Sequence, residues 1–114
     1  MADGYFLKQA DVEPVEMLEG VQRRTLGTTD EAMLCEFHLA TGAKVPQHSH
    51  MNDQVGYVIS GKLRLTIGDD TQLLSAGDSY AIHGAVDHAA VAEEDCLLID
   101  SFSPPRNDYR TEAR

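Results

Sequence analysis

Residues 42–61 read GAKVPQHSHMNDQVGYVISG and contain two histidines, His48 and His50, two positions apart. If the chain is extended here, residues i and i+2 project from the same face about 7 Å apart, so both imidazoles can bind one metal ion. Gln54 has the same parity, and its amide oxygen can reach the same centre. His88, on a neighbouring strand, is the candidate for a third imidazole. A His-x-His pair alone is weak evidence, because such pairs also occur at surfaces and in turns.

Glycines frame the histidine pair at a regular spacing. The run is Gly, five residues, His, one residue, His, three residues, Gln, six residues, Gly. A second group, at about 77–92, begins with glycine and contains His88. The two groups resemble motifs 1 and 2 of the cupin superfamily, with motif 1 at about 42–61. Gln54 stands where the general motif has Glu.

Motif 2 departs from the family pattern at three positions. His83 stands where the family usually has Pro, Ala85 where it has Gly, and Ala92 where it has Asn. The missing Pro and Gly affect the geometry of the loop. The metal-binding histidine of this half is retained as His88.

Two stretches of sequence resemble one subgroup of the cupin superfamily in particular. HSHMNDQVGYVISG at 48–61 and DSFSPPRNDY at 100–109 are similar to small single-domain cupins of the pectin-degradation (KdgF-like) type. Members of that group open the ring of 4,5-unsaturated uronates, released from pectin or alginate, to linear keto acids. The resemblance implies one divalent transition metal ion (Zn, Ni, Mn or Fe) and a homodimer. It also implies metal ligands at His48, His50, Gln54 and His88, and catalytic roles for Asp100, Phe102 and Arg106.

The residues near the C-terminus agree with this site. Asp100 and Phe102 lie two apart on an expected strand, so they face the same way, and an inward direction places a carboxylate and an aromatic wall beside the metal. Arg106 follows a Pro pair, and its planar guanidinium suits bidentate capture of a substrate carboxylate. Two alternatives stay open: Asp100 is an edge-strand acid paired with Arg106, and Phe102 is plain core.

Gln54 matters because its side chain is neutral, unlike the Glu of the general motif. With Gln and three neutral imidazoles, a divalent ion keeps its formal double charge, which attracts anions and polarises hydroxyls. The set departs from the two-His-one-carboxylate triad of iron oxygenases, which makes dioxygenase chemistry less favoured. The alternative is that Gln54 only orients a histidine by a hydrogen bond.

The pattern of the chain predicts an all-β fold, a single-domain cupin jelly-roll β-barrel over residues 1–114 with a C-terminal arm at 103–114. The first thirty residues are mixed and predict short strands or turns. After them, short apolar runs are separated by Gly- and Asp-rich turns, as in a sandwich or small barrel. The expected strands are 32–40, 54–60, 62–67, 72–74, 79–82, 89–91 and 96–102.

Composition restricts the partners. The 114 residues have a formal net charge of −10, which disfavours nucleic acid and anionic membranes as partners. An anionic small molecule remains possible if a local cation binds it. No apolar run approaches the length of a membrane helix and the N-terminus lacks a secretory pattern, so we expect a cytoplasmic protein. Cys35 and Cys96 are expected to be buried small hydrophobes.

The remaining candidates have structural interpretations. His38 and His83 have the wrong parity for ligands and are expected at the surface or at a subunit contact. Tyr57 and Ile59 have opposite parity to Gln54 and are expected to pack between sheets or subunits.

From the two motifs and the resemblance, we expect a metal-dependent cupin that linearises an unsaturated uronate. The alternatives are a non-catalytic, metal-dependent sugar or small-molecule binding protein and a metal-dependent dioxygenase.

Overall fold

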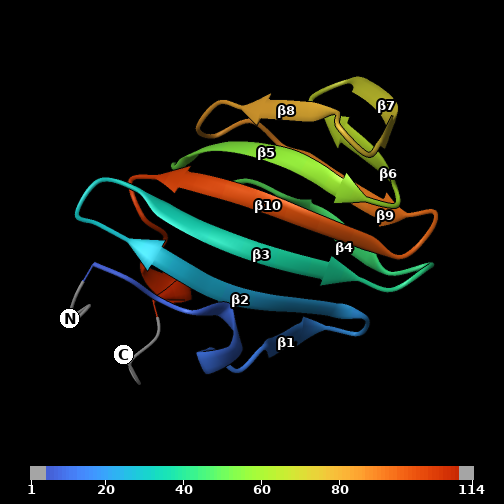
Figure 1. The fold of residues 1–114 in the computed structure, drawn as a ribbon. Helices are drawn as coiled ribbons and strands as arrows, with labels where there is room; N and C mark the ends of the chain where they lie inside the picture. Colours follow the sequence, from blue (N-terminus) through green and yellow to red (C-terminus); the bar gives the residue numbers. More distant parts are fainter. Residues whose placement is uncertain (1–4, 111–114) are drawn as a thin grey trace.

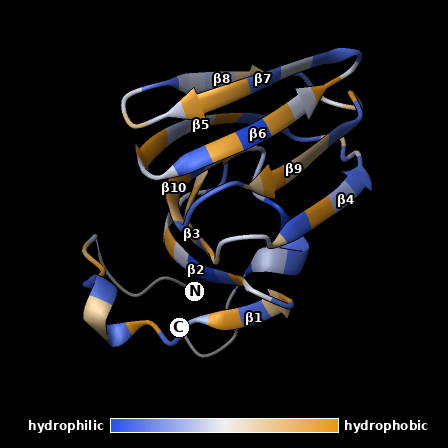
Figure 2. Cartoon of the chain, turned by 90° about the vertical axis from the view of Figure 1, so that its right-hand side faces the viewer, coloured by the Kyte–Doolittle hydropathy of each residue, from blue (hydrophilic) through white to orange (hydrophobic). Residues whose placement is uncertain are grey.

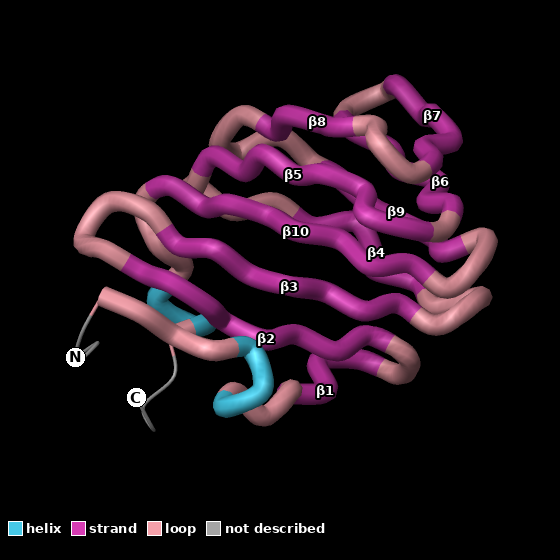
Figure 3. Tube along the Cα trace, in the orientation of Figure 1, coloured by secondary structure: helices cyan, strands magenta, loops and turns pink. Residues whose placement is uncertain are grey.

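The computed structural model describes residues 5–110, which form two antiparallel β-sheets facing each other (Figure 1). The six-stranded sheet has the order β1-β2-β3-β10-β5-β8, and the four-stranded sheet has the order β4-β9-β6-β7. Short 3-10 turns at Gln9–Asp11 and Asn107–Tyr109 are the helical segments of the described residues (Figure 3). The strands are β1 (Val15–Leu18), β2 (Val21–Thr28), β3 (Met33–Leu39), β4 (Lys44–His48), β5 (Asp53–Ser60), β6 (Lys62–Ile67), β7 (Asp70–Ser75), β8 (Ser79–Ile82), β9 (His88–Ala92) and β10 (Cys96–Ser103).

The sequence-based prediction of an all-β jelly roll is confirmed. Each strand expected after residue 30 is present, with ends that differ by at most two residues. The mixed first thirty residues form β1 and β2, and β4 is an additional strand. Residues 1–4 and the last part of the expected C-terminal arm, 111–114, lie outside the described residues. Among residues 5–110, no helix has the length and hydropathy needed to cross a membrane.

The core lies between the two sheets because alternate residues of each strand face inward. In β3 the buried apolar residues are Met33, Cys35, Phe37 and Leu39. In β6, hydrophobic and hydrophilic residues alternate visibly along the strand (Figure 2). Cys96 is also buried and both cysteines are free, as expected.

The chain changes sheets between β4 and β5. The condition of one extended run through 48–54, on which the parity argument depends, is therefore not met: β4 ends at His48 and β5 begins at Asp53. The connection is held instead by the loop between β8 and β9. The Ala85 amide donates to the His50 carbonyl at 2.7 Å, and the Gly84 amide donates to Asp53 Oδ1 at 2.8 Å.

The loop between β8 and β9 contains one departure from the cupin pattern, at Ala85. Ala85 has a φ of 71°, in the left-handed region that glycine adopts without strain. This is the position at which the family usually has Gly. The loop keeps its geometry with alanine, at the expense of local backbone strain.

Candidate metal centre

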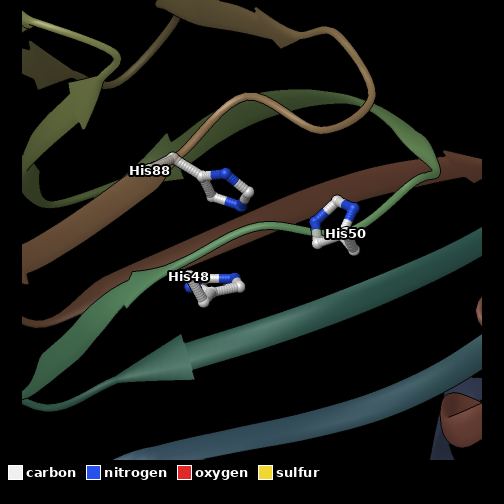
Figure 4. A group of neighbouring side chains, drawn as sticks. All are labelled: His48, His50 and His88. Atoms are coloured by element: carbon white, nitrogen blue, oxygen red, sulfur yellow. The ribbon is translucent and has the colours of Figure 1, made fainter.

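Three histidines point toward one another inside the molecule (Figure 4). His48, the last residue of β4, pairs with His88, the first residue of β9, and their ring centroids are 4.2 Å apart. The ring of His50, in the connection to β5, lies 4.9 Å from that of His88. Ligand nitrogens of the three rings all lie within 4.8 Å of one another, so the group could hold a metal ion.

Backbone carbonyl groups fix the tautomer of each ring. In each, Nδ1 lies near a carbonyl oxygen two residues away, at 2.9 Å for His48 and His88 and at 3.1 Å for His50. A carbonyl oxygen can only accept, so Nδ1 donates its proton and Nε2 keeps a lone pair. The Nε2 atom of His88 is buried and has no hydrogen-bond partner in the described part of the chain. A buried, unpaired acceptor beside two other imidazoles fits a metal ligand.

The electrostatic environment favours the neutral form of the His50 and His88 rings. Burial lowers the pKa of His50 and of His88, and the nearby Arg106 cation lowers both further. Neutral imidazole is the form that binds metal ions. The local environment therefore favours a ligand over a charged surface pair.

Gln54 presents its amide oxygen to the histidines. Its Nε2 donates to Asp100 Oδ1 at 3.2 Å, which leaves Oε1 facing Nε2 of His50 at 3.1 Å. With the proton on Nδ1 of His50, both facing atoms are acceptors, and two facing acceptors repel unless a cation lies beside them. The alternative, a hydrogen bond that only orients His50, needs the proton on Nε2. The donor set fits three imidazoles and one amide oxygen around a metal ion.

Asp100 is buried beside this group. It lies on β10, which is paired on both sides by β3 and β5, so the alternative of an edge-strand acid is wrong. Its partners are Gln54 and the hydroxyl group of Tyr80, whereas Arg106 pairs with Asp108 at 3.0 Å. Burial raises the pKa of Asp100 to about 6, and the two hydrogen bonds oppose this rise.

Phe102 and Arg106 form an aromatic and cationic side of the site. Phe102 is 1% exposed, and its ring lies edge-on to that of His50 at 5.7 Å between centroids. It also packs in the core, as the alternative interpretation expected. The guanidinium carbon of Arg106 lies 4.1 Å from the ring centroid of Tyr109 and 5.7 Å from that of Phe102. These rings fix the direction of the cation.

A cavity of about 380 Å³ reaches this group. It extends past the polar residues among aliphatic side chains that include Val21, Leu63 and Leu98. The predicted site residues that line it are His48, Gln54, His88, Asp100, Phe102 and Arg106. The seventh predicted residue, His50, belongs to the histidine group described above.

The other candidates lie elsewhere. His38 and His83 are exposed, and His38 Nε2 lies 3.6 Å from Glu36 Oε1. Tyr57 is 47% exposed and Ile59 is 43% exposed, so packing between the sheets is wrong for both. Their side chains face outward because their parity is opposite to that of Val58, which is buried.

Sequence reasoning missed Tyr80. This residue of β8 hydrogen-bonds to Asp100, although β5 lies between their strands. The available signal was Gly56, a glycine inside a strand of β-branched and aromatic residues. Such a glycine often marks a close approach of another group.

Comparisons with known proteins agree with this geometry. The cupin domain family matches residues 35–102. The pectin degradation protein KdgF of Dickeya dadantii (strain 3937) is 34% identical over 108 residues, which cover 92% of this chain and 96% of that protein. Among solved structures, KdgF from Halomonas sp. superposes with a TM-score of 0.89 at 32% identity, over 95% of this chain and 100% of that one.

A third similar protein is an RmlC-like cupin from Shewanella frigidimarina NCIMB 400. Its structure superposes with a TM-score of 0.90 at 32% identity, and the match covers 95% of this chain and 97% of that chain. The family match spans more than half of the sequence and coincides with the strands that carry the histidines. The chain therefore belongs to the cupin family and is similar to KdgF along nearly all of its length.

Proposed function

We propose that this protein is a metal-dependent cupin that opens the ring of 4,5-unsaturated uronates from pectin or alginate breakdown. The similarity to a pectin degradation protein supports the substrate class. The observation that carries the reaction is Asp100, a buried carboxyl group that lines one cavity with His48, His88 and Arg106. In this proposal Asp100 is the proton carrier and Arg106 is the group that binds the anionic substrate.

His48, His50, His88 and Gln54 would hold the metal ion. A divalent ion bound there supplies a Lewis acid that lowers the pKa of a coordinated hydroxyl group. Gln54 contributes no charge, so the centre keeps the full charge of the ion. This local positive charge offsets the net charge of −10 carried by the whole chain and favours an anionic substrate.

Arg106 and Phe102 would orient the substrate. The guanidinium group lines the cavity, is held over aromatic rings and can donate two parallel hydrogen bonds to a uronate carboxylate. Phe102 forms a wall beside His50 and keeps water from that side. Together they direct the hemiacetal end of the sugar toward the histidines and Asp100.

Asp100 would move the proton. Its carboxylate takes the proton from the anomeric hydroxyl, the C1–O5 bond breaks, and an aldehyde forms at C1 while O5 leaves as an enolate. Asp100 then gives the same proton to C4, and the enolate becomes a ketone at C5, so atoms and charge balance. A pKa of about 6 suits a group that must both accept and return a proton near neutral pH.

The test is turnover of unsaturated galacturonate, prepared fresh with a lyase. Ring opening is followed by loss of the ultraviolet absorbance of the C4–C5 double bond, corrected for the uncatalysed rate. Metal-loaded wild type is expected to exceed that rate, and Asp100→Asn to be slower by ~10²–10⁴-fold with its metal content retained. Asp69→Asn, an exposed acid in the turn between β6 and β7, is the matched control and should match wild type.

Other outcomes point to the alternatives. Wild type that does not exceed the uncatalysed rate refutes the uronate function. A metal-dependent small-molecule binding protein then becomes the better interpretation, and the aliphatic extension of the cavity favours it because a uronate does not need apolar walls. Oxygen consumption with bound iron would indicate a dioxygenase. An Asp100→Asn variant as active as wild type keeps the reaction but removes the proposed proton carrier.

A further inference from the structure

The inward face of β5 has a position without a side chain, at Gly56. In the sheet register Gly56 pairs with Asp100 of β10 on one side and with Tyr80 of β8 on the other. Its φ lies outside the left-handed region, so its backbone conformation does not require glycine. Another cause must explain a glycine in the middle of a strand.

That cause is the space above Gly56. A Cβ at this position would overlap Oδ1 of Asp100 and the ring carbons Cε1 and Cζ of Tyr80. The phenol ring thus lies across β5, over the glycine, and its hydroxyl group reaches the carboxyl group two strands away. A side chain as small as alanine would separate the two residues.

We propose that Tyr80 is a positioning residue, which reaches across the space above Gly56 and holds the Asp100 carboxyl group in its reactive orientation. The proposal rests on the proposed function, in which Asp100 moves the proton. Tyr80 need not touch the substrate, because it acts through the carboxyl group.

Two donors fix the carboxyl group. Gln54 Nε2 donates to Oδ1 at 3.2 Å, and the hydroxyl group of Tyr80 donates as well. Burial, followed by the charge of Asp100, raises the pKa of Tyr80 far above its ordinary range, so the phenol stays protonated and is a permanent donor. Without Tyr80, Gln54 alone would restrain the carboxyl group, which could then rotate away from the reacting atoms.

The variant that tests this is Tyr80→Phe, which keeps the ring and removes the donor. We expect kcat to fall by about 10- to 100-fold, the usual effect of losing a group that orients a reactive one, while KM and metal content stay at the wild-type values. Tyr5→Phe, which removes a hydroxyl group from a side chain 98% exposed, is the control and should have no effect. Gly56→Ala should reproduce the loss of kcat by closing the space. If Gly56→Ala does not fold, the kcat of Tyr80→Phe alone tests the proposal.

A double-mutant cycle separates positioning from general packing. In the Asp100→Asn background, Tyr80→Phe should cause no further fall in kcat, because the group it positions is gone. An unchanged kcat in Tyr80→Phe, or a further fall in the Asp100→Asn background, would overturn the proposal.

A second cycle distinguishes failure of this inference from failure of the proposed function. If wild type does not open uronates, the proposed function is wrong, and the four proteins are compared by urea unfolding. Effects of Tyr80→Phe and Asp100→Asn that are non-additive support the interaction between the two side chains. Additive effects show that the two side chains are independent and overturn it.

Discussion

Asp100→Asn is expected to change how the stability of the metal-free protein depends on pH. Asp100 is 2% exposed, and burial raises the pKa of its carboxyl group from 3.8 to about 6. The hydrogen bonds from Tyr80 and Gln54 lower this pKa and so only partly offset the effect of burial. A shift of about two units corresponds to about 3 kcal/mol. The ionised carboxylate therefore destabilises the metal-free fold by about this amount at neutral pH.

The sign follows from proton binding by the two states. Between pH 3.8 and about 6, the folded protein keeps a proton that the unfolded chain has lost, so stability falls as pH rises through this window. From pH 5 to pH 7.5, the two pKa values give a loss of about 1.4 kcal/mol. Asparagine has no such proton and keeps an oxygen for the donors. The free energy of unfolding of Asp100→Asn minus that of wild type should therefore rise by about 1.4 kcal/mol over this range.

The assay is urea unfolding, followed by circular dichroism, of chelator-treated protein at several pH values between 5 and 7.5. The lowered pKa values of His50 and His88 act with the opposite sign, but they are common to both proteins and cancel in the difference. Asp69→Asn serves as the control and should give a difference that is flat with pH. A flat or falling difference for Asp100→Asn would refute the reasoning. Loading the proteins with metal should reduce the slope, because a nearby cation favours the carboxylate.

Four further predictions concern the metal centre, assembly and backbone. His48→Ala combined with His50→Ala should reduce bound metal from about one ion per chain to almost none by elemental analysis, since one imidazole cannot hold the ion; full occupancy would contradict the ligand set. Gln54→Glu should keep or raise metal affinity and weaken binding of an anionic sugar acid in calorimetry, because the centre loses one positive charge; unchanged anion binding would argue against this. If the protein forms the expected homodimer through its exposed apolar face, Tyr57→Asp should convert it into a monomer in light scattering, because the variant places a charge on that face; a wild type that is already monomeric would exclude the dimer. Ala85→Gly should raise the free energy of unfolding by about 0.5–1 kcal/mol in urea, since glycine relieves the strain at a φ of 71° but loses more chain entropy; a lower stability would show that the strain is negligible.

The sequence predicted the histidine group for a partly wrong reason. Spacing correctly indicated that His48, His50 and His88 come together, but His48 and His50 do not share one strand. His48 ends a strand of one sheet, His50 lies in the connection, and Gln54 belongs to the other sheet. The spacing of the cupin motif already includes this change of sheet, whereas the parity rule assumes that the residues lie on one regular strand.

Parity predicts the side of a sheet on which a residue lies, but not what covers that side. Glu36 has the same outward parity as His38, yet it is only 9% exposed. Arg24 Nη1 and Gln9 Nε2 both donate to Glu36 Oε1, at 3.1 Å and 3.2 Å. This cover comes from β2 and from the 3-10 turn before β1. No local pattern in the sequence of β3 indicates that Glu36 is covered in this way.

The contact between Tyr80 and Asp100 was not predictable for a related reason. It depends on the register of three strands, which brings together residues from β5, β8 and β10. A single sequence gives the inward faces of these strands but not their alignment. Gly56 indicates that some group approaches closely, and only the register identifies that group as Tyr80.

The candidate ligands come from both sheets, which links the candidate metal centre to folding. His48 and His88 belong to the four-stranded sheet, whereas Gln54 belongs to the six-stranded sheet. An ion bound by all of them connects the two sheets, and its binding free energy stabilises the folded state because the unfolded chain has no preformed site. Without an ion, the fold must bury Nε2 of His88 unpaired and keep the carboxyl group of Asp100 away from water, both of which are unfavourable. The features that suit this histidine group to an ion are therefore the ones that weaken the metal-free fold.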